Sequence, residues 1–242
     1  MDCREQDIRT AMLLGAGGMR RLANAHVAVF GVGGVGGHLA EALARAGVGT
    51  ISLFDNDTVS LSNINRQAVA LHSTLGRPKV EVMRDRIMDI NPDCRVYPHQ
   101  TFYLPENADD YPLDGYDYIA DAIDTVSAKI ELAVRASHAG IRMIAAMGAG
   151  NRTDPTRFSV TDLFKTSGCP LARVMRRELK TRGIKHLKVV FSDEPTAHRP
   201  ADAPITETTD SHKPIPASLP FVPSVAGLIM AREIVTEIAC GK

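Results

Sequence analysis

The 242-residue chain has no tryptophan, and aromatic residues make up only 5% of it. It contains four cysteines, Cys3, Cys94, Cys169 and Cys240, which are far apart and form no C-x-x-C pair. This set argues against a disulfide framework and against a zinc site built from paired cysteines. It is typical of the reducing cytoplasm, and we therefore expect a cytoplasmic protein in which Cys169 is an inert small residue.

Net charge is also lacking, because 28 Lys and Arg balance 28 Asp and Glu. No overall field would draw the chain to nucleic acid or to a membrane, so such binding must come from a local patch. No stretch reaches 18 uncharged apolar residues, and the first ten residues lack the apolar core of a signal peptide. Residues 221–240 come nearest, but they contain Arg232, Glu233 and Glu237 and are interpreted as a buried or amphipathic helix.

What the chain does contain is an alternation of short apolar strands and helices. A strand at His26–Phe30 is followed by a glycine-rich turn, a helix over residues 35–46 and a strand at Thr50–Phe54. The same pattern predicts helices at 78–90 and 126–139, and strands at 94–97, 116–123 and 141–146. Parallel strands joined by helices indicate an α/β fold, a Rossmann-like, doubly wound and mainly parallel sheet.

The chain changes character after Gly150. The sequence predicts a strand at 158–162, a basic helix at 170–182 and a strand at 187–191. Residues 192–220 are rich in Pro, Thr, Asp and Ala and are interpreted as a mobile loop, which a closing helix from residue 223 follows. We expect residues 1–150 to form a nucleotide-binding unit and residues 151–242 a small C-terminal extension, within one continuous domain.

A glycine-rich turn follows the first predicted strand, with Gly31, Gly33, Gly34 and Gly36. Such glycines let backbone N–H groups approach a phosphate, and the next helix offers its positive end. Asp55 ends the second strand nineteen residues after Gly36, where a carboxylate can accept both ribose hydroxyls. The alternative is that the glycines serve only a tight turn and close helix packing.

Four side chains downstream of Asp55 indicate which nucleotide binds. They are Asn63, Arg66, Gln67 and Lys79. These donors suit a triphosphate, because Arg grips phosphate oxygens with two N–H groups and Lys acts as a point charge. Asp124 is predicted to close the fourth strand, where it could hold Mg²⁺. Taken singly, the cations could be solvated surface charges and Asp124 a helix cap.

Together these motifs resemble the ubiquitin-activating-type (ThiF- and MoeB-like) adenylyltransferases. The matching motifs are G-x-G-G-x-G, D-x-D-x-V-x-x-S-N-x-x-R-Q from Asp55, R-P-K, and Ala122-x-Asp124 with Lys129. The resemblance spans residues 9–150 and implies ATP and Mg²⁺ as cofactors. It implies nucleotide contacts from Gly31, Gly33, Gly34, Gly36, Asp55, Asp57 and Gln67. It implies catalytic roles for Arg9, Asn63, Arg66, Lys79 and Asp124, with Asp124 as the metal ligand.

The same resemblance implies a homodimer in which Arg9 reaches into the neighbour's site. Sulfur-carrier activators of this family usually carry two C-x-x-C pairs, and this chain has none. Its motifs at 154–156, 161–163, 165–167 and 170–184 look instead like the branch that dehydrates threonylcarbamoyladenosine in tRNA. That branch uses ATP to cyclise the modification beside the anticodon. The alternatives are activation of the C-terminus of a small ubiquitin-like sulfur carrier and a non-catalytic nucleotide-binding scaffold. A sulfur-transfer protein is a further candidate partner.

A basic segment supports tRNA as the partner. Between Arg173 and Lys188, seven Lys and Arg stand against one acid, Glu178, a net charge of +6 within sixteen residues. The residues expected to contact tRNA are Arg173, Arg176, Arg177, Lys180 and Arg182. Because no aromatic residue interleaves them, they favour recognition of the phosphate backbone over base stacking. The alternative is a solvated helix face.

Overall fold

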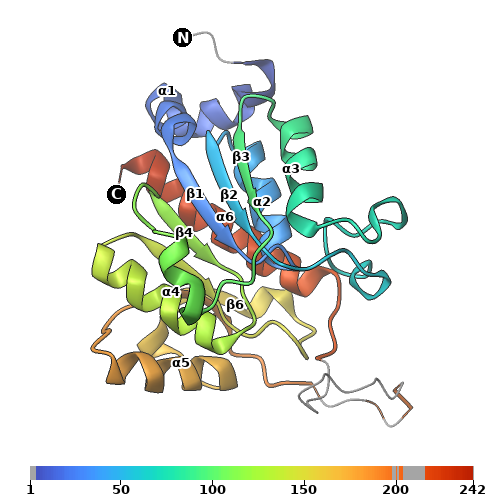
Figure 1. Cartoon of the computed structure of the whole chain (residues 1–242), viewed down its shortest axis with the longest axis vertical. Helices are drawn as coiled ribbons and strands as arrows, with labels where there is room; N and C mark the ends of the chain where they lie inside the picture. The colour runs from blue at the N-terminus through green and yellow to red at the C-terminus, as the bar shows by residue number, and fades with distance from the viewer. Residues whose placement is uncertain (1–3, 198–199, 201, 204–215, 242) are drawn as a thin grey trace.

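The computed structural model describes residues 4–197, 200, 202–203 and 216–241, which form an α/β fold around one sheet (Figure 1). The sheet has seven strands in the order β3-β2-β1-β4-β5-β7-β6, and every neighbouring pair is parallel except β6 and β7. The strands are β1 His26–Phe30, β2 Thr50–Phe54, β3 Arg95–His99, β4 Tyr118–Asp121, β5 Met143–Ala146, β6 Phe158–Asp162 and β7 Lys188–Ser192. The predicted Rossmann-like sheet is confirmed.

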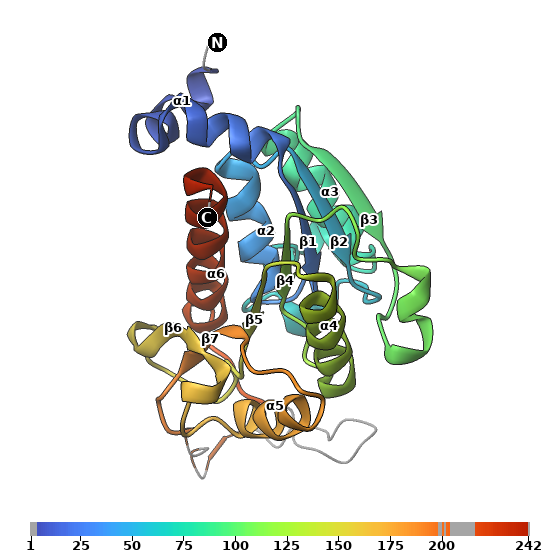
Figure 2. The ribbon, with the colours of Figure 1, turned by 90° about the vertical axis from the view of Figure 1, so that its left-hand side faces the viewer.

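Helices cover both faces of this sheet (Figure 2). They are α1 Ile8–Asn24, α2 Gly36–Arg45, α3 Lys79–Ile90, α4 Val126–Ala139, α5 Pro170–Thr181 and α6 Phe221–Cys240. One apolar core lies between the sheet and α2, α3 and α6, and a second lies between the sheet and α4 and α5. The inner strands β1, β2, β4 and β5 are therefore buried on both faces, as expected for parallel strands with continuous apolar runs.

The first helix, α1, was not predicted from the sequence. It precedes β1 and is broken at Gly15, whose φ of 67° and ψ of 167° are non-helical. Three glycines within Ile8–Asn24 weaken the intrinsic preference for a helix. Packing against α6 holds α1 in place. Its first part still leaves Met12 and Leu13 80% and 88% exposed.

Residues after 150 continue the same sheet. Strands β7 and β6 extend it beyond β5, and α6 returns to pack against α1 and α2. At the start of β7, Lys188 lies 3.5 Å from Glu233 on α6 and also pairs with Glu237. No boundary interrupts the sheet at residue 150, and the proposed division at that point stays a prediction.

The interpreted mobile loop at 192–220 falls largely on residues 198–199, 201 and 204–215, which lie outside the described part of the chain. Ser192 itself belongs to β7. Helix α6 begins at Phe221, two residues earlier than predicted, with Pro223 in its first turn, where a missing N–H costs nothing. Among the described residues, no helix is long and apolar enough to cross a membrane.

Docking of α6 should contribute much of the stability of the fold. Ile234 on α6 is fully buried in the core shared with the sheet and α2. We expect Ile234→Ala to lower the free energy of unfolding by about 2–5 kcal/mol, because it leaves a cavity. Arg232→Ala, on the exposed side of the same helix, should change it by less than about 0.5 kcal/mol. Urea unfolding measures both, and equal losses would contradict the packing described.

Candidate nucleotide-binding site

A cavity of about 750 Å³ opens at the carboxyl ends of the parallel strands. The loops after β1, β2, β4 and β5 line it. The chain proceeds from β1 outward to β2 and β3, and from β4 outward in the other direction. Open α/β sheets bind ligands in the crevice at such a reversal of strand order.

The glycine turn after β1 is held by close backbone contacts. Gly31 has a φ of +88°, and a Cβ there would lie 2.6 Å from the carbonyl oxygen of Ala122. A Cβ on Gly36 would lie 1.8 Å from the carbonyl oxygen of Gly31. Gly31, Gly33 and Gly34 line the cavity, but Gly36 does not. Gly36 therefore serves the packing of α2 against the turn, the alternative considered for these glycines.

Asp55 follows β2 at the edge of the cavity. Its Oδ2 accepts the Val32 N–H at 2.7 Å, and its Oδ1 accepts the Asp57 N–H at 2.9 Å. Burial raises the pKa of Asp55 above its ordinary value, although Lys79 and these two N–H groups act against the rise. Each oxygen keeps a further lone pair, so the fixed carboxylate can accept two ligand hydroxyls.

Lys79 and Asp57 form an ion pair at the wall of the cavity. The Lys79 side chain is 5% exposed, and its Nζ lies 2.6 Å from Oδ2 of Asp57. Lys79 is the first residue of α3, where Pro78 precedes it, so the helix start aims the ammonium at the cavity. An ammonium has three donors, and Asp57 takes one of them. The others remain for a phosphate.

Arg66, Asn63 and Gln67 line the same wall of the cavity. Arg66 donates from Nη1 to the carbonyl oxygen of Ser62 at 2.9 Å, which holds its guanidinium at the cavity. Asn63 accepts the Ser60 N–H at 3.2 Å through Oδ1, so its amide NH₂ remains to donate. Oε1 of Gln67 is buried with no partner among the described residues. A buried acceptor of this kind fits a ligand that brings a donor.

The acid that ends β4 is Asp121, and the prediction that Asp124 closes this strand was wrong. Asp124 lies three residues farther on, exposed at the cavity, where Thr125 Oγ1 donates to it at 3.4 Å. Asp121 and Lys129 are both fully buried, and Oδ2 lies 2.8 Å from Nζ. Lys129 also donates to the carbonyl oxygen of Ile123 at 3.3 Å, so the pair holds the loop that carries Asp124.

An aromatic wall of the cavity was not found from the sequence. Phe30 and Phe54, the last residues of β1 and β2, stack at 4.2 Å between ring centroids. His99, at the end of β3, stacks on Phe54 at 4.4 Å, and Tyr103 meets Phe30 edge to face at 5.0 Å. Phe30, Phe54 and Tyr103 line the cavity next to Asp55. Such a wall suits a planar base.

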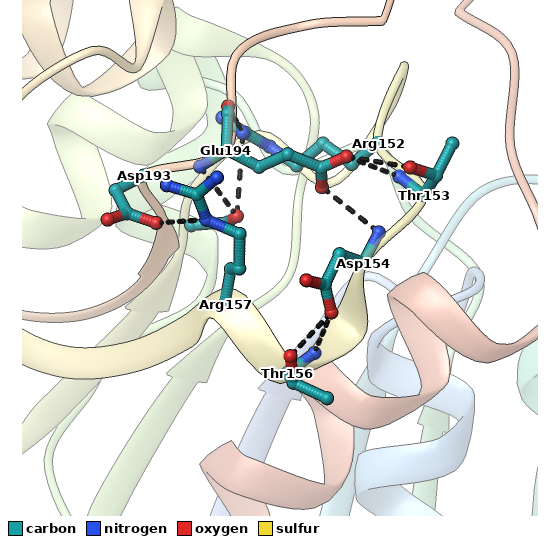
Figure 3. A network of polar contacts seen from close by, with 8 residues as sticks. Arg152, Thr153, Asp154, Thr156, Arg157, Asp193 and Glu194 are labelled. Atoms are coloured by element: carbon teal, nitrogen blue, oxygen red, sulfur yellow. Dashed lines mark hydrogen bonds and ion pairs between the residues drawn. The ribbon is translucent and has the colours of Figure 1, made fainter.

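The loop after β5 forms the opposite wall, where residues 148–150 line the cavity. A buried polar network behind it holds the loop to the end of β7 (Figure 3). Arg152 donates from Nε to the carbonyl oxygen of Gly148 at 2.9 Å and from Nη1 to that of Glu194. The Glu194 carboxylate accepts the N–H groups of Thr153 and Asp154, at 2.9 and 3.2 Å. Burial opposes ionisation of Glu194, but these bonds outweigh it and lower its pKa.

Arg9 lies outside this cavity. It is exposed on α1, no part of which lines the cavity. Helix α1 instead lies at the amino-terminal edge of the sheet, the edge opposite the cavity (Figure 1). Arg9 lines a separate hollow of about 380 Å³ with Leu13 and Val235. Within one chain, Arg9 is therefore not brought together with the other predicted catalytic residues.

The basic helix α5 presents fewer free cations than its sequence suggests. Arg176 turns inward and donates to the carbonyl oxygen of Thr166 at 2.9 Å. Glu178 pairs with Arg177 at 2.8 Å and with Arg182 at 3.0 Å.

Lys188, counted in the net charge of +6, belongs to β7 and pairs with α6. Arg173 and Lys180 are exposed and have no ion-pair partner among the described residues. The surface therefore carries less free positive charge than predicted.

No group of three His, Cys, Asp or Glu side chains that could hold a metal ion occurs in the described part of the chain. Mg²⁺ does not require such a cage, because it is commonly held by one or two carboxylates together with substrate phosphates. Asp124 offers one exposed carboxylate at the cavity, on the loop beside the glycine turn. The donor set fits Mg²⁺ bound jointly with a phosphate ligand.

The sheet, the glycine turn and the cavity define an α/β nucleotide-binding protein of the Rossmann-like class. The chain belongs to the ThiF family, whose model matches residues 6–241, and this confirms the family resemblance. It is 45% identical to the tRNA threonylcarbamoyladenosine dehydratase of Bacillus subtilis, over 95% of this chain and 93% of that protein.

A solved structure supports the same assignment. The tRNA N6-threonylcarbamoyladenosine dehydratase of Escherichia coli, in complex with ATP, superposes with a TM-score of 0.88 and 35% identity. That match covers 98% of this chain and 95% of the other. Similarity to the molybdopterin-synthase adenylyltransferase of Salmonella typhimurium, at 39% identity, covers only 48% of this chain and 46% of that protein.

The Asp121–Lys129 pair should be necessary for the fold at the cavity. Burial raises the pKa of Asp121, and Lys129 counteracts this rise. We expect Lys129→Met to lower the free energy of unfolding by about 3–5 kcal/mol, because it leaves a buried carboxylate unpaired. Chemical denaturation measures this loss. The exposed Lys185→Met is the matched control and should stay near wild type; a loss below about 1 kcal/mol for Lys129→Met would contradict the role given to the pair.

Proposed function

We propose that this chain is an ATP-dependent tRNA threonylcarbamoyladenosine dehydratase. The observation that carries the proposal is its similarity, over nearly the whole length of both chains, to the dehydratase of Bacillus subtilis. The match to the molybdopterin-synthase enzyme, by contrast, covers less than half of either chain. Because its proposed substrate is tRNA, we place the protein in the cytoplasm.

The lining of the cavity supports a specific placement of ATP. The base lies against the aromatic wall of Phe30, Phe54 and Tyr103, and Asp55 accepts the ribose hydroxyls. The triphosphate lies beside the glycine turn, where Arg66 and Gln67 approach Gly34 and Gly33. Those nucleotide and phosphate contacts are Gly31, Gly33, Gly34, Asp57, Asn63, Arg66, Gln67 and Lys79. Gly36 contributes only indirectly, through the packing of α2.

Asp124 would hold Mg²⁺ together with phosphate oxygens. When bound, this ion neutralises charge on the phosphates. The protein's own contribution is to fix Asp124: the Asp121–Lys129 pair anchors its loop, and the loop lies against Gly31. Lys79 and Arg66 supply further positive charge at the cavity. Together these groups stabilise the negative charge that develops as pyrophosphate departs.

The reaction begins with a carboxylate, which is a poor electrophile. An oxygen of the threonylcarbamoyl carboxylate attacks the α-phosphorus of ATP, pyrophosphate leaves, and an acyl adenylate forms. A nitrogen or oxygen of the same side chain then attacks the acyl carbon and closes a five-membered ring. AMP leaves with the former carboxylate oxygen, so the tRNA loses the elements of water. Because the attack is intramolecular, no enzymic nucleophile is required.

A homodimer would complete the site. Arg9 is remote from the cavity of its own chain, and the same part of α1 exposes Met12 and Leu13. Large apolar side chains exposed together are typical of a protein interface. We propose that two copies pair so that this part of α1 lies against the partner's cavity, where each Arg9 stabilises phosphate charge. Any sulfur-transfer partner belongs to the alternative activity.

One experiment tests the proposed function. Purified protein, ATP, Mg²⁺ and threonylcarbamoyladenosine-containing tRNA are incubated, and nucleoside mass spectrometry follows the loss of one water from the modification. We expect this loss to depend on ATP. Pyrophosphate exchange that required a sulfur-carrier protein and ignored tRNA would instead favour the alternative activity. Nucleotide binding with neither reaction would favour a scaffold.

Arg66 and Asp124 should be required for turnover. We expect Arg66→Ala and Asp124→Ala each to lower kcat/KM by about 10²–10³-fold, because each removes charge stabilisation from the transition state. The same water-loss assay measures the effect. Arg45→Ala is the matched control, since Arg45 lies on α2, pairs with Glu41 on the surface and does not line the cavity. Rates like those of the wild type in both site variants would refute the assignment.

The free cations of α5 should contribute to tRNA affinity. We expect Arg173→Ala and Lys180→Ala each to weaken tRNA binding and to reduce its salt dependence by about one phosphate contact. Filter binding over a range of salt concentrations measures both quantities. Arg45→Ala removes the same charge from a distant helix and should leave the slope unchanged. An unchanged slope in both α5 variants would place the tRNA elsewhere.

A further inference from the structure

Asn151 joins two distant segments of the chain at the edge of the cavity. Its N–H donates to the carbonyl oxygen of Ala217 at 2.8 Å, and its Oδ1 accepts the Ala217 N–H at 2.8 Å. Its own carbonyl oxygen accepts the Ala197 N–H at 2.7 Å. Asn151 thus connects the segment that follows β7 with the segment that leads into α6.

The backbone of Asn151 is adapted to this task. Its φ of 56° lies in the left-handed region, and no other non-glycine residue of the described chain has a positive φ. Asparagine tolerates this region better than most residues, because its short amide can bond locally. The conformation turns the N–H, the carbonyl and the side chain toward the two segments. An unusual backbone conformation beside a binding cavity is a reason to look for a functional constraint.

Gly150 brings the same two walls into contact. A Cβ at Gly150 would lie 2.6 Å from Cβ of Pro216, closer than real side chains approach. Residues 148–150 and 216–218 all line the cavity, so these segments form one continuous wall. Asn65 adds a link from the opposite side, since its Nδ2 donates to the carbonyl oxygen of Ser218 at 3.1 Å. Behind the wall, Arg152 and Glu194 hold the loop to the end of β7 (Figure 3).

This wall lies at the end of the cavity that the nucleotide leaves free. Strand order places Asp55 after β2, the glycine turn after β1, Asp124 after β4 and residues 148–150 after β5. In the placement of ATP proposed above, the base and ribose take the β2 side and the phosphates the middle. The acid to be adenylated must then approach from the β5 side, past residues 148–150 and 216–218.

We infer that Asn151 is a positioning residue that holds residues 216–218 against the loop after β5 and so sets where the acyl group of the substrate lies for attack on ATP. The inference rests on the proposed function. Asn151 does not itself line the cavity. It acts through the wall, whose displacement by about 1 Å is enough to reduce the rate about 10²-fold in oriented reactions.

Three substitutions separate the side-chain bond from the backbone conformation. Asn151→Gly keeps the positive φ and removes the acceptor for the Ala217 N–H. Asn151→Asp keeps an acceptor at the same place and should rescue the function. Asn151→Ala loses the acceptor and also strains the backbone. Arg157→Ala is the matched control, because Arg157 pairs with Asp193 in the same region but on the surface.

The measurements are the water-loss reaction on modified tRNA and calorimetric titration with ATP and Mg²⁺ in the absence of tRNA. For Asn151→Gly we expect kcat/KM for tRNA to fall about 10-fold, with ATP affinity within about 2-fold of wild type. Asn151→Asp and Arg157→Ala should both stay within about 2-fold in each measurement. Asn151→Ala should fall at least as far as Asn151→Gly.

Either of two results would overturn the inference. The first is tRNA turnover by Asn151→Gly equal to that of the wild type. The second is a loss of ATP affinity as large as the loss of tRNA turnover, which a merely structural role would produce. If Asn151→Gly does not fold, Gly150→Ala replaces it, since its methyl group must displace Pro216. The same split between tRNA turnover and ATP affinity is expected there, and its absence overturns the inference. Failure of the proposed function is distinguishable, because the wild type itself would then remove no water.

Discussion

The carbonyl group of Gly31 is the point at which the parts of the site meet. It fills the space that a side chain at position 36 would need, and Gly31 itself lies against the backbone of Ala122. These contacts bring the turn after β1, the start of α2 and the loop after β4 within van der Waals distance. The glycine turn and the loop that carries Asp124 therefore occupy fixed positions relative to each other, which is the preorganisation that charge stabilisation requires.

Around that contact, the charged groups of the site are held by their own neighbours. Two backbone N–H groups fix the Asp55 carboxylate, Asp57 holds Lys79, and the buried Asp121–Lys129 pair anchors the Asp124 loop. Each arrangement leaves donors or acceptors unused at the cavity. An enzyme that relies on positioning and electrostatics, with no nucleophile of its own, needs side chains that are both restrained and incompletely satisfied.

Local patterns predicted most of the fold. The alternation of apolar strands and helices located all seven strands, and the motifs located polar residues that line the cavity, because both signals lie close together in sequence. The aromatic wall of Phe30, Phe54 and Tyr103 was not located, because no motif contains it. The features that the sequence did not predict depend on contacts between residues far apart in the chain. Helix α1 depends on packing against α6, the inward turn of Arg176 depends on Thr166, and Lys188 pairs with acids on α6 although it belongs to a basic segment of the sequence. The pairing of Asn151 with Ala217 joins residues 66 positions apart, beyond the reach of any periodicity.

The hydrogen bonds of Asn151 also indicate where such a chain can change in length during evolution. Ala197 and Ala217 both form hydrogen bonds with Asn151, so the stretch of chain between them starts and ends at the same place. Lengthening a stretch whose ends already meet costs little free energy, since the entropy of loop closure grows only with the logarithm of its length. Insertions and deletions between these positions should therefore accumulate among homologues without disturbing the sheet.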